Sequence, residues 1–310
     1  MGNRIALVTG AGGQIGTELL HALRRQLGAN NVIASDLRPL DVEGPFEIIN
    51  VTDTKRIAEV VDKYKITEIY HLAALLSSKG EQNIDLTWTI NFKAYQDILA
   101  MSVEKGIDRI FFPSTIGIFG PTTPKQFTPQ NTSFIPSTVY GISKITGELW
   151  GQYYNNRFGL DVRSLRFPGV ISYEVLPVGG TTDFAVEIFF ETVKSGHYTC
   201  YLEKDTRLPM IYMPDVIKAT LGLMTADKSK LSTSMGYNIQ GFSLTPEEVH
   251  NEIKRHIPEA TISYKPDARQ KIANSWSETI DDTMALTDWD WRPEHDMSSM
   301  TVDMIKHLSL

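Results

Sequence analysis

The chain has 310 residues, 42% of them hydrophobic and 22% charged, as expected for a soluble globular protein with a large core. The formal net charge of −7 and the absence of a Lys/Arg-rich run argue against a nucleic-acid binder. A single cysteine, Cys200, excludes an internal disulfide and a cysteine-rich metal site. The seven histidines show no paired ligand spacing, so we expect no metal.

The beginning of the chain and its hydropathy favour a cytoplasmic location. A strand-like run at residues 4–9 follows the first methionine so closely that no room is left for a signal or transit peptide. No apolar stretch approaches the roughly 18 residues needed to span a bilayer, so we expect no membrane partner. The length predicts one large α/β domain, or such a domain with a smaller cap.

A glycine-rich turn follows this first strand. Residues 5–8 form a short apolar run typical of a strand buried on both faces, and a helical pattern begins after residue 13. Glycines at three-residue intervals permit a sharp turn, close approach to a pyrophosphate and tight packing of strand against helix. The helix N-terminus also attracts phosphate. We therefore predict cofactor contacts from the residues of this turn: Gly10, Gly13, Gln14, Ile15 and Gly16.

An acidic residue ends the second predicted strand, residues 31–36. Asp36 lies 20 residues beyond Gly16, where a carboxylate can accept both adenosine ribose hydroxyls and would repel a 2′-phosphate. This favours NAD over NADP, with Leu37 as a further contact. Arg38, two residues later, keeps this preference for NAD from being complete. The simpler alternative is that Asp36 is only an acidic residue at the start of an exposed loop.

Strands and helices continue to alternate through the first half. Predicted strands at residues 46–49, 68–73 and 109–112 are separated by helices near residues 54–61 and 86–103, a pattern typical of a doubly wound parallel sheet. Ligands bind such sheets at the carboxyl ends of the strands. The residues at those ends include Gly10, Asp36, Ala73 and Thr115, with Leu72, Ala74 and Ser114 beside them.

Tyr140 and Lys144 are spaced to share one face of a helix, one turn apart. A nearby ammonium group lowers the pKa of a phenol, so Tyr140 is a candidate general base. Lowering the tyrosine pKa from about 10 to neutral pH requires about 4 kcal/mol, which is more than one partly solvated lysine supplies. An oxidised nicotinamide ring would add a second positive charge. Thr115, or Ser114 beside it, could hydrogen-bond the reacting oxygen.

The second half is expected to form mainly a cap over the crevice. A sixth strand, residues 162–167, ends before Pro168, and a helix follows with Thr182 or Asp183 as its cap. The turn before that helix could bind a substrate carboxylate, or simply cap the helix. Residues 211–215 and 236–240 predict a return to the sheet, and residues 245–248 predict a helix start. Trp276 either closes the pocket or belongs to the core.

We therefore predict an α/β fold with two parts. Residues 1–170 form an NAD-binding, Rossmann-like doubly wound parallel sheet, to which segments near residues 208–240 return. Residues 171–310 form mainly a smaller mixed α/β substrate-binding cap.

These features together resemble the extended short-chain dehydrogenase/reductase family. The matching elements are Gly10-x-x-Gly13-x-x-Gly16, Asp36, Leu72-Ala73-Ala74, Asn91, Ser114-Thr115 and Tyr140-x-x-x-Lys144. The resemblance implies that Tyr140 is the base, that Lys144 also holds the nicotinamide ribose and that Thr115 orients the substrate hydroxyl. It further implies cofactor contacts at Asn50, Val51, Asn91, Phe167 and Pro168. Asn50 departs from the aspartate common in the family, which puts its contact near the adenine in doubt.

Within this family the chain is most similar to the L-threonine 3-dehydrogenases. The supporting stretches are residues 71–77, 119–124, 137–144, 179–185 and 269–276. The similarity implies NAD-dependent oxidation of L-threonine at C3 to L-2-amino-3-oxobutanoate, and pairing of two chains through a helix bundle. The substrate contacts that it implies are Ser77, Thr115, Tyr140, Thr181, Thr182 and Trp276.

Two other functions stay open. A nucleotide-sugar epimerase or dehydratase would need cations for its pyrophosphate, and Arg163, Arg166 and Arg207 form no obvious cluster in the sequence. A non-catalytic NAD-sensing module would usually lack the tyrosine or the lysine, and both are present.

Overall fold

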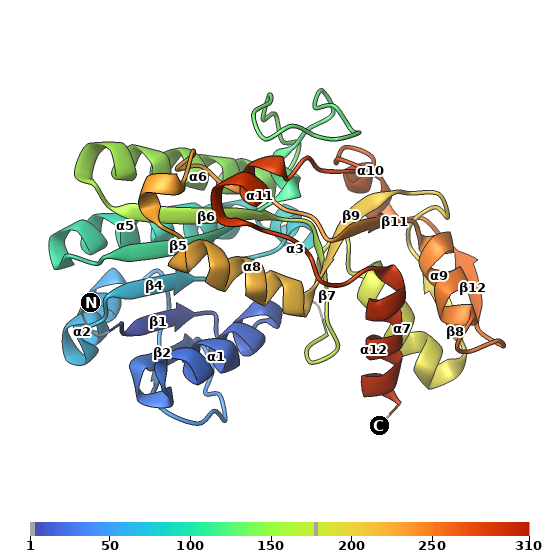
Figure 1. The fold of residues 1–310 in the computed structure, drawn as a ribbon, viewed down its shortest axis with the longest axis horizontal. Helices are drawn as coiled ribbons and strands as arrows, with labels where there is room; N and C mark the ends of the chain where they lie inside the picture. The colour runs from blue at the N-terminus through green and yellow to red at the C-terminus, as the bar shows by residue number, and fades with distance from the viewer. Residues whose placement is uncertain (1–3, 177–178, 310) are drawn as a thin grey trace.

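The computed structural model describes residues 4–176 and 179–309; residues 1–3, 177–178 and 310 lie outside the description. In the described chain, seven parallel strands form a central sheet in the order β10–β6–β5–β4–β1–β2–β3 (Figure 1). The strands are β1 (Ala6–Thr9), β2 (Val32–Asp36), β3 (Phe46–Ile48), β4 (Glu68–His71), β5 (Arg109–Thr115), β6 (Asp161–Phe167) and β10 (Tyr237–Asn238). The predicted doubly wound parallel sheet is confirmed.

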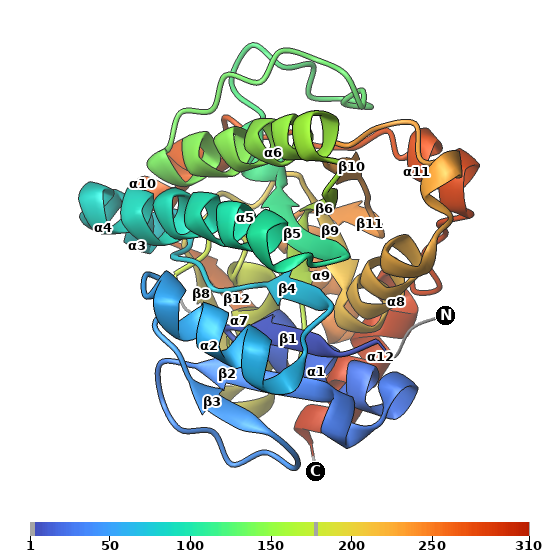
Figure 2. The same cartoon turned by 90° about the vertical axis from the view of Figure 1, so that its left-hand side faces the viewer.

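Helices cover both faces of this sheet (Figure 2). On one face lie α2 (Thr54–Tyr64), α5 (Ala94–Lys105) and α6 (Val139–Phe158), whose apolar side chains share a core with β1, β4 and β5. On the other face lie α1 (Gln14–Leu27), α8 (Met213–Thr225) and α11 (Thr283–Trp289). Burial on both faces explains why the strands read as continuous apolar runs.

The second half builds a separate core beside the sheet. Within the described residues, β7 (Gly169–Ile171), β9 (Leu208–Tyr212) and β11 (Phe242–Leu244) form one small sheet, and β8 (His197–Cys200) pairs with β12 (Thr261–Tyr264). Three helices pack around them: α7 (Phe184–Ser195), α9 (Pro246–Lys254) and α12 (Met297–Leu308). The predicted helix start at Thr245 is confirmed, since its hydroxyl and Glu248 form a reciprocal capping box.

One prediction for the second half needs correction. Residues 236–240 return to the central sheet as β10, whereas residues 211–215 lie in β9 and α8, and β9 pairs with β7 and β11 instead. Apolar residues then place α8 over the central sheet. Within the late segment, which was predicted to be mainly cap, α11 packs against β10 through the same core as α1 and α8.

The helix predicted at residues 86–103 is interrupted. It comprises α4 (Ile84–Trp88), a π-helical turn at Thr89–Lys93 and then α5. The remaining short elements are α3 (Ser77–Gln82), α10 (Ala268–Ala273) and 3₁₀ turns at Ala29–Asn31, Ile116–Ile118 and Lys228–Lys230. Across the described ranges, no helix combines the length and apolar character needed to cross a membrane. The same ranges contain no group of three His, Cys, Asp or Glu side chains placed to hold a metal.

Two of the three glycines in the first turn are required by geometry. Gly10 has φ = +68°, and a Cβ there would stand 2.9 Å from the Ala73 nitrogen. A Cβ at Gly16 would stand 2.2 Å from the Gly10 carbonyl oxygen. Strand β1 and helix α1 can therefore approach closely only while residue 16 lacks a side chain.

We expect Gly16→Ala to lower the free energy of unfolding by about 1–3 kcal/mol or more, because the new methyl group meets backbone that cannot move independently. Urea unfolding followed by circular dichroism measures this. Gly222→Ala in α8 is the matched control, since its Cβ would meet the Trp289 ring at an ordinary 3.4 Å and alanine favours the helix. Equal stability of the two variants would contradict the packing role of Gly16.

Candidate active site

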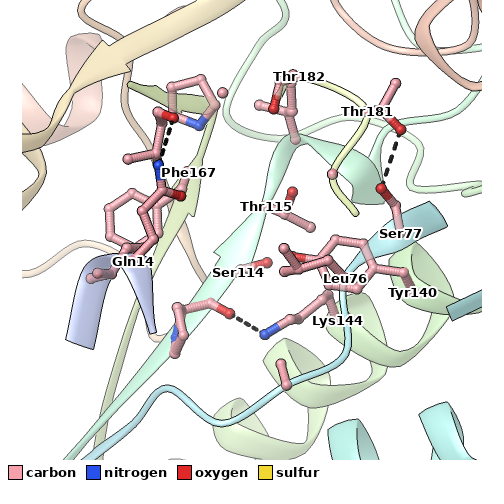
Figure 3. Close-up of a pocket in the computed structure, with 18 of the residues that line it drawn as sticks. Gln14, Leu76, Ser77, Ser114, Thr115, Tyr140, Lys144, Phe167, Thr181 and Thr182 are labelled. Carbon is pink, nitrogen blue, oxygen red and sulfur yellow. Dashed lines mark hydrogen bonds between the residues drawn. The ribbon is translucent and has the colours of Figure 1, made fainter. Parts of the chain in front are cut away.

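A cavity of about 240 Å³ lies where the carboxyl ends of β1, β4, β5 and β6 meet the cap (Figure 3). Cofactor-side predictions that line it are Gly10, Gly13, Gln14, Ile15, Gly16, Leu72, Ala74, Ser114, Phe167 and Pro168. The predicted catalytic and substrate residues that line it are Ser77, Thr115, Tyr140, Lys144, Thr181, Thr182 and Trp276. Figure 3 shows Thr115, Tyr140, Ser77 and Thr181 around one part of the cavity, with Gln14 and Phe167 across from them.

The glycine turn is shaped to receive a dinucleotide. Gly10, Gly13 and Gly16 line the cavity, and the missing side chains of Gly10 and Gly16 let this turn pack closely against Ala73 and against its own backbone. The first amides of a helix lack acceptors within it and attract phosphate oxygens. Gln14 is held in place by donating from Nε2 to the Ser172 hydroxyl at 2.9 Å and to the Val170 carbonyl at 3.3 Å. These residues fit the pyrophosphate of NAD.

Several predicted cofactor residues lie outside the cavity. Asp36 accepts the Gly12 and Leu37 amides at 3.1 and 2.8 Å, so its carboxylate is fixed at the end of β2 beside the glycine turn. Leu37 is exposed. Asn50 accepts from the Thr52 amide and hydroxyl, and Val51 is buried. The backbone of Ala73 packs against Gly10. Adenosine contacts at these positions stay predictions.

Asn91 has a local structural role. It lies in the π-helical turn, is buried, and does not line the cavity. Its Oδ1 accepts the Leu75 amide at 2.8 Å, and its Nδ2 donates to the Leu75 carbonyl at 2.9 Å and to the Ser143 hydroxyl at 3.4 Å. Asn91 therefore fixes the chain after β4, which carries the cavity residues Leu72, Ala74 and Leu76.

Tyr140 and Lys144 lie in the first two turns of α6, as their spacing predicted. Thr138 caps this helix by accepting the Gly141 amide. The Lys144 ammonium is buried, donates to the Pro113 carbonyl at 2.7 Å, and lies 5.7 Å from the centre of the Tyr140 ring. Pro113 lies past the end of the pairing of β5 with β4, and on the other side it is opposite Leu165 of β6.

The protonation of this pair differs from the prediction. Burial raises the pKa of Tyr140 to about 12, with the Thr115 hydroxyl acting in the opposite direction. Burial also lowers the pKa of Lys144 to about 7. The prediction of a lowered tyrosine pKa assumed that Lys144 carries a full positive charge. Desolvation disfavours both charged forms, so Lys144 alone does not make Tyr140 a base.

Thr115 and Ser114 have different hydrogen-bond partners. The Ser114 hydroxyl donates to Glu148, which commits its proton. The Thr115 oxygen accepts the Gly117 amide at 3.1 Å, so its hydroxyl proton is available to a second partner. Since Thr115 is also the hydroxyl that acts on the Tyr140 pKa, it is better placed than Ser114 to bind a reacting oxygen.

Glu148 belongs to a buried ion pair behind the cavity. Arg166 donates to both of its carboxylate oxygens at 2.9–3.2 Å, and both side chains are almost fully buried. Glu148 also accepts the Gly236 amide, and Arg166 donates to the Gln130 carbonyl and to Asn238. The pair thus joins α6, β6, β10 and the loop before α6.

The other two arginines considered for pyrophosphate binding are also paired. Arg163 contacts Asp161 at 2.9 Å, and Arg207 contacts Glu248 at 2.5 Å. Of the cavity-lining residues in the described chain, Lys144 is the only lysine or arginine.

The substrate-side residues bring the two halves together. The Ser77 and Thr181 hydroxyls are 3.2 Å apart, and the Ser78 amide donates to the Gly179 carbonyl at 3.1 Å. The Tyr201 hydroxyl donates to the Thr181 carbonyl at 3.4 Å. Trp276 is buried and lies beside Gly117, whose added Cβ would be 3.4 Å from the indole.

Asp183 is a charged cavity residue that the sequence analysis did not include among the functional candidates. Asp183 was predicted only as an alternative helix cap, but neither its carboxylate nor Thr182 makes a side-chain cap to α7. Asp183 Oδ2 instead accepts the Gly180 amide at 2.7 Å. Burial raises the Asp183 pKa to about 6. An acid at a helix start reads as a cap, and only tertiary structure reveals that it lines a cavity. Leu76, Ile116 and Val170 were also missed, since apolar lining carries no sequence signal.

Comparison with known proteins identifies the family. Residues 6–239 match the model of the NAD dependent epimerase/dehydratase family. An uncharacterized epimerase/dehydratase from Staphylococcus haemolyticus is 44% identical over 97% of this chain and 96% of its own. The solved structure of a GalE-like L-threonine dehydrogenase from Cupriavidus necator, holo form, is 45% identical with a TM-score of 0.96, and the match covers 98% of this chain and 99% of that one. A monomeric L-threonine 3-dehydrogenase from a metagenome database is 43% identical with a TM-score of 0.96, over 98% of this chain and 99% of that one. The chain therefore belongs to the NAD-dependent epimerase/dehydratase family, and its cofactor is NAD.

Proposed function

We propose that this protein is an NAD-dependent L-threonine 3-dehydrogenase that converts L-threonine to L-2-amino-3-oxobutanoate, a step of threonine catabolism. The observation that carries the proposal is the meeting of Tyr140 and Thr115 with the hydroxyls of Ser77 and Thr181 in one cavity. The cap supplies Thr181, and the match to two L-threonine dehydrogenase structures, at 43% and 45% identity overall, covers 98% of this chain and so includes the cap.

In this reaction Tyr140, as phenolate, takes the proton of the C3 hydroxyl, while Thr115 hydrogen-bonds the same oxygen. A bound NAD would supply the hydride acceptor for C3 and a positive charge that favours the phenolate. Moving the Tyr140 pKa from about 12 to near 7 corresponds to about 7 kcal/mol. Phenolate formation also favours protonated Lys144, so the two groups titrate as a pair. Lys144 would also hold the nicotinamide ribose.

A sugar-nucleotide epimerase or dehydratase is less well supported. Its substrate carries a second pyrophosphate, yet Arg163, Arg166 and Arg207 are each paired with a carboxylate. A pyrophosphate would have to compete with those carboxylates for a cation. A non-catalytic NAD sensor is also disfavoured, because the tyrosine and lysine line the cavity together with Thr115.

We further propose a homodimer and a cytoplasmic location. Helix α6 exposes Ile142, Leu149 and Tyr153, which recur at intervals that keep them on one face of the helix. A second copy could bury this face. One similar structure is described as monomeric, so the oligomeric state needs a direct measurement.

The purified enzyme is expected to reduce NAD with L-threonine, and not with UDP- or GDP-sugars. Tyr140→Phe should lower turnover by about 10³-fold or more, since it removes the phenol that takes the proton. NAD affinity, measured by calorimetry, should change little because the ring remains. Substantial turnover by this variant would exclude Tyr140 as the base. A wild-type enzyme inactive on threonine but active on a sugar nucleotide would favour the alternative.

Thr115→Val is expected to reduce kcat/KM roughly 10²-fold by removing one hydrogen bond to the reacting oxygen. Because the Thr115 hydroxyl lowers the Tyr140 pKa, kcat/KM should also level off at a higher pH in the variant. Thr115→Ser keeps the hydroxyl and is the control, expected to retain the wild-type pH profile. Identical pH profiles for Thr115→Val and wild type would count against this contact.

Light scattering should give twice the chain mass for the wild type. Leu149→Glu places a charge within the proposed α6 interface and is expected to yield a monomer. Val302→Glu changes a similarly exposed residue on α12 and should leave the dimer intact. A monomeric wild type, or a dimer unaffected by Leu149→Glu, would contradict the α6 interface.

A further inference from the structure

The turn that leads into α7 carries the cap-side residues of the cavity. Gly180, Thr181, Thr182 and Asp183 all line it, and the Thr181 hydroxyl lies 3.2 Å from that of Ser77 (Figure 3). Asp183 makes no side-chain cap bond to α7. The bond from the Gly180 amide to the Asp183 carboxylate shapes the turn internally, but it does not attach the turn to the rest of the cap.

The hydroxyl of Tyr201 makes that attachment. Tyr201 follows β8 directly, is 6% exposed and does not line the cavity. Its hydroxyl donates to the Thr181 carbonyl at 3.4 Å and accepts the Phe184 amide, the first amide of α7. Since the first amides of a helix lack acceptors within it, this hydroxyl serves as a cap supplied by another segment. The Tyr201 and Phe184 rings also pack edge to face, with centres 6.5 Å apart.

Arg269 holds the Tyr201 ring in place. Its guanidinium carbon lies 3.1 Å from the ring centre, so the positive charge covers one face of the ring. Asp267 accepts from Nη2 at 2.6 Å and from Nε at 3.0 Å, and the Asp267 amide donates to the Tyr201 carbonyl at 3.2 Å. The guanidinium therefore cannot leave the ring without breaking its pair with Asp267. Arg269, like Tyr201, does not line the cavity.

The Tyr201 hydroxyl remains a donor because it keeps its proton. Burial raises the pKa of Tyr201 far above its usual range, and the carboxylates of Asp183 and Glu187 act in the same direction. Arg269 acts in the opposite direction without cancelling the effect of burial. The bond to the Thr181 carbonyl is therefore not lost by titration at neutral or moderately alkaline pH.

We propose that Tyr201 and Arg269 are positioning residues for the substrate: Tyr201 fixes the turn at residues 180–184, and Arg269 acts only by orienting Tyr201. This assignment rests on the proposed function, in which Thr181 and Thr182 contact threonine. Thr181 lines the cavity, while its carbonyl is bound by a residue outside the lining. Displacing such a substrate contact by about 1 Å can cost as much as removing it.

Tyr201→Phe keeps the ring and removes the hydroxyl. We expect it to raise KM for L-threonine about fivefold or more, by loss of a hydrogen bond and loosening of the turn. The value of kcat and the affinity for NAD should stay within about twofold, since Tyr140 and Thr115 are held by α6 and β5. An unchanged KM, or a fall in kcat as large as the rise in KM, would overturn the assignment.

Tyr198→Phe is the matched control. Tyr198 lies in β8, is buried like Tyr201, and also donates its hydroxyl to α7, but its partner is Glu187 at 3.0 Å rather than the turn. Its KM for L-threonine should equal that of the wild type. A rise in KM as large as that of Tyr201→Phe would show a general effect of loosening α7 and would overturn the positioning role.

A double-mutant cycle tests whether Arg269 acts through Tyr201. Arg269→Met removes the charge and the planar group, and we expect it to raise KM about threefold or more. In the Tyr201→Phe background the same substitution should raise KM by less than about twofold, because no hydroxyl is left to orient. Fully additive effects would assign Arg269 a separate route, its charge acting on Asp183, and would overturn the proposal.

Hydrogen exchange provides a readout that needs no substrate. The amides of residues 180–185 should exchange faster in Tyr201→Phe than in the wild type and in Tyr198→Phe, whereas the second half of α7 should exchange equally in all three. Equal exchange at residues 180–185 would overturn the positioning role. Failure of the wild type to oxidise threonine would instead overturn the proposed function, and the exchange rates would still decide whether Tyr201 fixes the turn.

Discussion

The buried ion pair between Arg166 and Glu148 determines where the reactive helix lies. Glu148 follows Lys144 by four residues and Tyr140 by eight, so the three side chains recur on one face of α6. Removing either charge would leave the other buried without a partner, which is far more costly than losing a surface contact. Because Arg166 lies in β6 and Ser114 in β5 donates to the same carboxylate, α6 cannot slide along the sheet without breaking this pair.

Around the cavity lie titratable side chains whose charged forms are disfavoured by burial. Tyr140, Lys144 and Asp183 each have a pKa moved toward the neutral form. Desolvation of this kind is typical of functional sites, because a dry site strengthens every interaction with a charged ligand. The phenol and the amine can exchange a proton with each other, whereas the carboxylate is stabilised by the backbone amide of Gly180 and by the charge of Arg269.

Local patterns predicted much of this arrangement. The alternating strands, the glycine turn and the Tyr140–Lys144 spacing depend on neighbouring residues, and the structure places them as expected. The direction of the Tyr140 pKa shift could not be predicted, because it depends on burial by distant segments. The pairing of Arg166 with Glu148 could not be predicted either, because 18 residues separate the two in the sequence. Strand β9 carries the apolar run expected of a sheet strand, and the run does not specify which sheet. The adenosine contacts of Asp36, Leu37, Asn50 and Val51 remain predictions.

The π-helical turn at Thr89–Lys93 has an evolutionary consequence. A single π turn is equivalent to one extra residue inserted into an α-helix. That residue shifts the phase between α4 and α5 by about 100° and lets Asn91 face Leu75 while both flanking helices remain packed. Deleting one residue there would restore a regular helix at the cost of this contact. The length of this segment should therefore be inherited more strictly than its exposed side chains.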